Sequence, residues 1–234
     1  MWGILHMVRH ASKPQPKGSQ HWIQELVNTN QGILTEALRS PLGLAPTQGI
    51  NWRSPLAVDD YAEYQDGDFL TRLGIQLPGT PLNTFWPRLG PCWDALGITV
   101  LNQPILVEAK SHICELNSPP CGAGIKTSID LINVSLQKTQ IAMKATASAA
   151  DWSKTFYQYA NRLAHLHLLR GLNDFDAYLV FLHCINDQDM KGPANKEEWL
   201  GAINLLQCQL GLSKNPYENY IIDLFYDVNA NQFV

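Results

Sequence analysis

Short apolar runs alternate along this chain with segments of helical character, and few folds accommodate that order. The runs at 175–185 and 220–228 have the length and the aromatic and aliphatic content of buried strands. Between them, residues 196–210 form a predicted helix. Strands mixed with helices in this way favour a sheet covered by helices on both faces. We therefore expect an α/β fold, a three-layer sandwich with a central mixed β-sheet flanked by helices.

The other predicted elements lie earlier in the chain. They are one or two short helices within 21–38, a helix over 59–73, strands at 93–100 and 105–113, and helices over 125–143 and 152–169. The two strands flank a LeuAsnGlnPro turn, so they should pair as an antiparallel hairpin within the central sheet. The helices over 125–143 and 152–169 are expected to pack on that sheet. Between Ser40 and Pro55, frequent Pro and Gly predict no regular element. Residues 1–20 are expected to form a flexible lead-in, and 21–234 a single domain.

The composition is that of a globular protein with a sizeable core, with 45% hydrophobic and 16% charged residues. The formal net charge of -4 argues against a generally basic surface of the kind that coats nucleic acid. Any contact with nucleic acid must therefore be local. Acidic metal ligands would themselves contribute to such a negative balance, so the charge leaves a nuclease possible.

The cysteines favour a reducing compartment. The chain has five cysteines and no CxxC pair, which is not the pattern of a disulfide framework. Residues 1–9 lack the apolar core of a signal peptide, and no apolar run reaches the roughly 18 residues of a membrane span. We expect a cytoplasmic protein without a membrane partner.

Two segments match the short acidic-x-Lys pattern, and chance alone gives about one match in a chain of this composition. Residues 189–191 lie in a polar loop bounded by Gly and Pro and are interpreted as a solvated turn. Glu108, Ala109 and Lys110 instead follow an apolar run on a predicted inner strand. Alternation places Glu108 and Lys110 on one face of that strand. A surface ion pair at a strand end is the alternative.

Asp94 favours a functional site over a surface ion pair, because it begins the strand that should pair with the run ending at Lys110. A hairpin would bring its carboxylate beside that of Glu108. Two carboxylates and the Ala109 carbonyl are the hard oxygen ligands that Mg²⁺ requires, and Mn²⁺ could replace it. Lys110 would then stabilise phosphate charge or help to deprotonate the attacking water.

These motifs resemble the core of the PD-(D/E)XK nuclease superfamily, whose fold is restriction-endonuclease-like. The resemblance rests on Pro91-Cys92-Trp93-Asp94 and on 108–110 at a strand end with a helix following. The chain departs from the pattern at Cys92 and Trp93, which separate the proline from the aspartate. More broadly, 86–96, 107–112 and 156–165 resemble an uncharacterised bacterial group of this superfamily, and the similarity covers roughly 50–230.

The resemblance implies further site residues. The superfamily often has a glutamate on a preceding helix, and Glu63 in the 59–73 helix is the best match, although Asp60, Asp66 and Asp68 compete with it. Some exonuclease branches place a glutamine and a tyrosine on a helix beside the site, so Gln158 and Arg162 could face phosphate. An ordinary amphipathic helix is the alternative for these two residues.

Further candidates come from position and charge. His112 would share a face with Glu108 and Lys110 if the 105–113 strand continued that far. The local phosphate contacts are expected to be Arg162 and, as further candidates, Arg88 or Lys126.

Two functions follow as hypotheses. The first is a metal-dependent nuclease that hydrolyses phosphodiester bonds, with DNA favoured over RNA, Asp94, Glu108, Lys110 and Glu63 as catalytic residues, and Asp94, Glu108 and Ala109 as metal ligands. The second is a non-catalytic binding module that keeps the fold, which the acidic balance favours. A different metal hydrolase would need more histidines near the site than the sequence provides.

Overall fold

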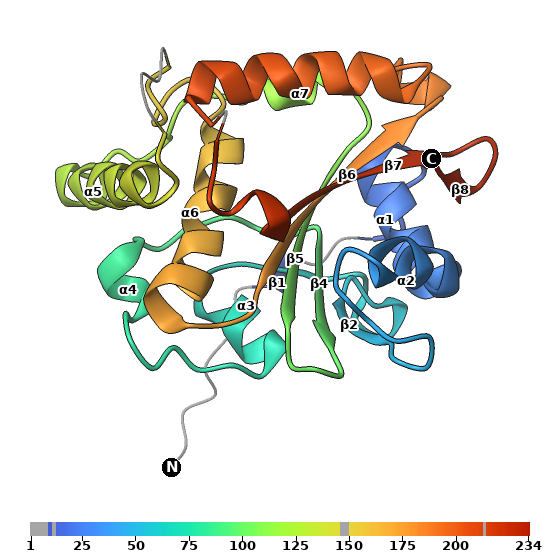
Figure 1. The fold of residues 1–234 in the computed structure, drawn as a ribbon, viewed down its shortest axis with the longest axis horizontal. Helices are drawn as coiled ribbons and strands as arrows, with labels where there is room; N and C mark the ends of the chain where they lie inside the picture. The colour runs from blue at the N-terminus through green and yellow to red at the C-terminus, as the bar shows by residue number, and fades with distance from the viewer. Residues whose placement is uncertain (1–8, 11–12, 146–149, 213) are drawn as a thin grey trace.

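A computed structural model describes residues 9–10, 13–145, 150–212 and 214–234 and shows the predicted α/β architecture (Figure 1). One mixed sheet has the strand order β2-β4-β5-β6-β7-β8. Its strands are β2 Ile50–Ser54, β4 Ala95–Thr99, β5 Pro104–Lys110, β6 Tyr178–Ile185, β7 Ile221–Asp227 and β8 Gln232–Phe233. The pairs β5–β6 and β6–β7 are parallel and the other pairs are antiparallel. The hairpin of β4 and β5 is therefore as predicted.

Two hydrophobic clusters lie on opposite faces of the sheet. Helices α1 Gly18–Asn28 and α2 Gln31–Arg39 pack on one face, against residues such as Val107 and Val180. Helices α6 Tyr157–Asn173 and α7 Lys196–Leu210 pack on the other, against residues such as Leu106 and Phe181. Because β5 alternates, Glu108 and Lys110 share the second face with Leu106. The sheet and its two helical layers form the expected sandwich.

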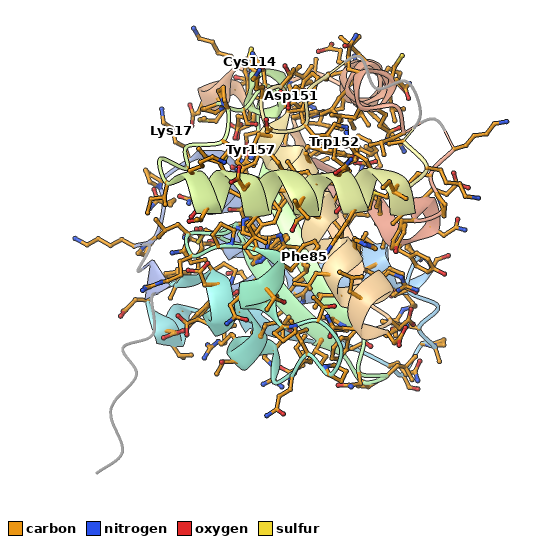
Figure 2. All side chains as sticks on the ribbon, turned by 90° about the vertical axis from the view of Figure 1, so that its left-hand side faces the viewer. Lys17, Phe85, Cys114, Asp151, Trp152 and Tyr157 are labelled. Atoms are coloured by element: carbon orange, nitrogen blue, oxygen red, sulfur yellow. The ribbon has the colours of Figure 1, made fainter. Side chains whose placement is uncertain are left out.

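Helix α5 Lys126–Ala142 lies outside α6. It packs against α6 and the short helix α4 Leu82–Phe85, and Figure 2 shows it crossing in front of the rest of the molecule. Of the two helices expected on the central sheet, α6 thus contacts it at β6, whereas α5 forms an outer layer.

The predicted helix over 59–73 is wrong in its first half. A 3₁₀ turn, Ala57–Asp59, is followed by Asp60 and Tyr61, both in the left-handed region with φ near 52°. The chain then forms strand β3, Glu63–Tyr64, which pairs with β1, Arg9–His10, and α3 begins at Asp66 and ends at Leu73. Two successive left-handed residues cannot continue a helix. Glu63 therefore lies on a strand.

Three other boundaries differ from prediction. Strand β2 occupies the stretch where no element was expected, and its alternate residues Ile50, Trp52 and Ser54 are buried. Helix α6 begins at Tyr157 rather than near 152, because Phe156 is left-handed at φ 57°. Helix α1 begins at Gly18, inside the expected lead-in, of which residues 1–8 and 11–12 lie outside the described residues.

The remaining predicted elements are confirmed, with α7 having the predicted bounds. In the part of the chain that the structure describes, no helix is long and apolar enough to cross a membrane.

Candidate active site

The site is built where β5 ends beside the start of β4. Asp94 immediately precedes β4, and its Oδ2 accepts a hydrogen bond from the Ala109 backbone N–H at 2.7 Å. The N–H and C=O of one strand residue point to the same edge, so the Ala109 carbonyl also faces the edge where Asp94 lies. The structure thus brings Asp94 next to Glu108 and Lys110, as the hairpin predicts.

Glu108 lies between two cations in the protein interior. Its Oε1 accepts from Lys110 Nζ at 2.5 Å, and its Oε2 accepts from Arg162 Nε at 2.7 Å and contacts Nη2 at 2.6 Å. The residues are 2%, 9% and 3% exposed respectively. Burial opposes ionisation, but the charges of Arg162 and Lys110 outweigh it and lower the pKa of Glu108. Burial likewise opposes the charge of Lys110, but Glu108 and Asp94 raise its pKa.

Arg162 is held by protein acceptors. Besides Glu108, it donates from Nη2 to the Cys92 carbonyl at 2.8 Å and from Nη1 to Asn161 Oδ1 at 2.9 Å. Its guanidinium also lies 4.8 Å from the centre of the Trp93 ring. Each of the three nitrogens thus has a protein acceptor, and a phosphate contact at Arg162 stays a prediction. Arg162 positions Glu108.

Glu63 approaches the site from β3. The isolated bridge between Tyr64 and Trp93 holds β3 beside the segment that leads to Asp94. Glu63 Oε1 accepts from Gln20 Nε2 at 2.9 Å, and Cys92 Sγ lies 3.6 Å from Oε2. Burial, together with the charge of Glu108, raises the pKa of Glu63 to about 7. Glu63 therefore lies near Asp94, as predicted from the sequence, but on a strand rather than on the predicted helix.

A cavity of about 420 Å³ opens at these residues. Its lining comes from β3 and the segment before β4, from the loop between the 3₁₀ turn Ile113–Leu116 and α5, and from the first turns of α6. The full lining is Glu63, Pro91, Cys92, Asp94, Ser118, Pro119, Tyr157, Gln158, Asn161 and Arg162. The competing acids Asp60, Asp66 and Asp68 do not line it.

Helix α6 brings Gln158 into the site, as expected. Gln158 Oε1 accepts a hydrogen bond from Lys110 Nζ at 2.9 Å. Tyr157 and Asn161, which the sequence analysis did not select, also line the cavity. The sequence feature that could have identified them is their position beside Gln158 and Arg162 on one helix, where residues three or four apart share a face.

Three other predicted contacts lie elsewhere. Residue His112 is not on the strand: β5 ends at Lys110, and His112 Nδ1 accepts from the Cys114 N–H at 2.8 Å as the cap of a 3₁₀ turn. Arg88 is exposed beside a different cavity, of about 410 Å³, lined by Asp66, Gly67, Leu82, Asn83, Trp86 and Pro87. Lys126 forms an exposed pair with Asp130 on α5.

The metal prediction can be tested against the donor groups. Among the described residues, no group of three or more His, Cys, Asp or Glu side chains is arranged to hold a metal ion as it stands. The two cations on Glu108 give a physical reason, because they already satisfy both of its oxygens.

Asp94 does fit a hard cation. Burial, followed by the charges of Glu108 and Glu63, raises its pKa well above the usual range, so a nearby cation would relieve unfavourable interactions. Asp94, the Ala109 carbonyl and Glu63 have the oxygen chemistry that Mg²⁺ prefers. Glu108 could join them only by giving up Lys110 or Arg162.

The raised pKa of Glu63 predicts a pH effect on stability. A carboxyl with a pKa of about 7 when folded and 4.5 when unfolded stabilises the folded state fully below the unfolded pKa. That contribution is lost as pH rises through the folded pKa. As pH rises from the unfolded to the folded pKa, wild type should lose stability whereas Glu63→Gln should not. The free energy of unfolding of Glu63→Gln should therefore rise by about 2 to 3 kcal/mol relative to that of wild type. Urea unfolding across the window, without added divalent cations, measures the difference.

The exposed Glu197→Gln variant is the matched control for this experiment. Its unfolding free energy should follow that of wild type at each pH. Parallel profiles for Glu63→Gln and wild type would show that Glu63 is ionised in the folded protein throughout.

Asp94, the ion-paired Glu108 and Lys110 thus lie together at the end of strand β5 in the mixed sheet. The resemblance to the PD-(D/E)XK superfamily stays a prediction. No family model matches the chain, and the searches of curated proteins and of solved structures found no match.

Proposed function

We propose that this protein is a metal-dependent nuclease that hydrolyses phosphodiester bonds, with DNA favoured over RNA. The observation that carries the proposal is the placement of Asp94 beside Glu108 and Lys110 at the end of β5, with Asp94 itself on the wall of a cavity. The raised pKa of Asp94 supports it, because perturbed carboxyls in clefts are frequent at functional sites.

Each residue has a distinct role in this proposal. Asp94, Glu63 and the Ala109 carbonyl would hold Mg²⁺ or Mn²⁺, which supplies Lewis acidity to the reaction when bound. Lys110 stays protonated because its pKa is raised, so it acts on the phosphate as a positive charge rather than as a base. Gln158 accepts from Lys110 and Arg162 fixes Glu108, so both keep the charged groups in position.

Cation binding is tested most simply by thermal unfolding. We expect Mg²⁺ or Mn²⁺ to raise the Tm of wild type by a few degrees, and more at about pH 8 than at about pH 6. The reason is that the carboxyls must be ionised to bind a metal, and the pKa values of Asp94 and Glu63 are raised.

Two isosteric variants make this test specific. Asp94→Asn should lose the shift, whereas Asp130→Asn, which changes an exposed acid on α5, should keep it. An equal shift in all three proteins would place the cation elsewhere, and no shift in wild type would remove the proposed ligand set.

A second function has one observation in its favour. Glu108 is fully neutralised by Lys110 and Arg162, so this buried cluster needs no metal ion to be stable. A binding module that keeps the fold without hydrolysis would retain such a cluster for packing. Binding of nucleic acid without cleavage, in either cation, would select this alternative.

A further inference from the structure

We infer that the cavity takes a single unpaired nucleotide, recognised through its base by Tyr157 rather than through its phosphates. This inference rests on the proposed function, because it names the substrate class of the same site. The inference is carried by the depth of the reactive groups, the charge state of the cavity wall and the aromatic residue in that wall.

The reactive groups lie too deep for a duplex. Glu63 and Asp94 line the cavity, and Glu108 and Lys110 lie behind its wall at 2% and 9% exposure, so a phosphate that approaches these groups must enter the cavity. The cavity volume of about 420 Å³ is in the range of small-molecule sites. A base-paired double helix presents its phosphates on a broad outer surface, and that surface cannot pass into such a cavity. One strand has to leave its partner first.

The wall offers little free positive charge for phosphates. In the part of the chain that the structure describes, Arg162 is the basic residue among the lining groups, and its nitrogens already bond to Glu108, Cys92 and Asn161. Lys110, behind the wall, is paired with Glu108. Ordinary single-strand binding releases counterions in proportion to the phosphates that are neutralised. This cavity must obtain affinity in another way.

Tyr157 offers a source of binding affinity that does not depend on charge. It is half-buried, packs partly against the core and lines the same cavity as Glu63 and Asp94. Figure 2 shows it between α5 and the segment that carries Cys114. The left-handed Phe156 sets the direction in which the chain enters α6, and the Gln158 N–H is bonded to Ser118 Oγ at 2.8 Å. These features fix the start of α6 and therefore the backbone position of Tyr157.

An aromatic ring in such a position can stack on any base. Base–aromatic stacking is insensitive to sequence because each base has a π face. Exposed Pro119 and half-buried Ser118 border the same side and leave it neutral. The wall thus combines an uncharged aromatic side for a base with an acidic side for a cation and a phosphodiester, which is the division expected for one unstacked nucleotide.

Binding of labelled oligonucleotides to the full chain tests the inference, with Ca²⁺ as a hard cation that takes the same oxygen ligands. Wild type should bind a single strand at least about 10-fold more tightly than a blunt duplex of the same sequence. The affinity should fall about 10-fold or more in Tyr157→Ala and stay within about twofold in Tyr157→Phe, which keeps the ring. The slope of log affinity against log salt should be shallower than about −2.

A second measurement needs no variant and so does not depend on folding. An abasic strand of the same length should bind wild type about 10-fold or more weakly than the normal strand, because it keeps the phosphates and loses the base. DNA and RNA strands are compared in parallel, and a preference for either identifies the sugar. Equal binding of abasic and normal strands, a preference for duplex, or a slope steeper than about −2 would overturn the inference.

Cleavage in Mg²⁺ or Mn²⁺ separates this inference from the proposed function. Cleavage of duplex and single strands at equal rates would leave the nuclease standing and remove the base site. Base-dependent binding without any cleavage would leave the base site standing and remove the nuclease.

Discussion

Asp94→Asn is expected to lower the rate of phosphodiester cleavage by about 100-fold or more. The substitution removes the negative oxygen that would bind the cation, but the amide oxygen can still accept the bond from the Ala109 N–H. The fold should therefore survive. Because burial and the neighbouring charges of Glu108 and Glu63 raise the pKa of Asp94, the neutral amide should be as stable as wild type, or more stable, near neutral pH.

The same logic separates two classes of variant. Glu63→Gln should also lower cleavage and weaken cation binding, whereas Lys110→Ala should abolish cleavage but leave cation binding largely intact. The acid supplies negative charge to the cation, whereas the lysine acts on the phosphate. Calorimetric titration of Mg²⁺ and Mn²⁺ is run beside cleavage of single- and double-stranded DNA and RNA. Cation affinity that falls as far in Lys110→Ala as in Asp94→Asn would contradict this division of roles.

Arg162→Met should lower the free energy of unfolding by about 3 to 5 kcal/mol. The methionine keeps much of the side-chain length but leaves the Glu108 oxygen Oε2 without its cation at 2% exposure. Removing one member of a buried ion pair leaves an uncompensated charge, which costs more than the pair itself contributes. The loss of the contact with the Trp93 ring adds to the effect.

An exposed ion pair provides the matched control. Lys126→Met breaks the pair with Asp130, whose side chains are 86% and 57% exposed, and should cost less than about 0.5 kcal/mol. Urea unfolding measures both variants. The combined change Glu108→Leu, Lys110→Met and Arg162→Met should recover much of the stability, because it removes the three ion-paired charges together. A loss below about 1 kcal/mol for Arg162→Met would show that water reaches Glu108.

The arrangement of strands was predictable where pairing and periodicity agree. Strand β5 is an apolar run that ends in Glu108 and Lys110, and alternation alone places those two side chains on one face. Helix α7 begins directly after the capping residue Asn195 and ends before the left-handed Gly211, and both signals are local. Such elements can be located from sequence because their boundaries depend on neighbouring residues.

The misplaced parts depend on contacts that are distant in sequence. Strand β2 includes exposed Asn51 and exists because it pairs with β4. Glu63 was assigned to a helix because acidic residues surround it, but the acids Asp66 and Asp68 lie in the first turn of the actual helix. The bridge between Tyr64 and Trp93 then brings Glu63 to the site. No local pattern shows that contact.

The partners of Arg162 also depend on contacts that are distant in sequence. An arginine on a helix beside a candidate nuclease site suggests a phosphate contact. In the structure its guanidinium bonds to Glu108 and to the Cys92 carbonyl and lies over the Trp93 ring. These groups meet only when the β4–β5 hairpin and α6 pack together. The residue type was predictable from sequence, but its partner was not.

Cleavage of an end-labelled single strand by wild type and by Asp94→Asn, prepared in the same way, decides whether Asp94 acts in a metal-dependent nuclease. Asp94 is the acid that the proposal assigns to the cation, and the variant keeps the bond to Ala109. We expect cleavage by wild type in Mg²⁺ or Mn²⁺, none with the cation chelated, and at least about 100-fold less with Asp94→Asn. No cleavage by wild type in either cation, or equal cleavage by the two proteins, would contradict the proposal.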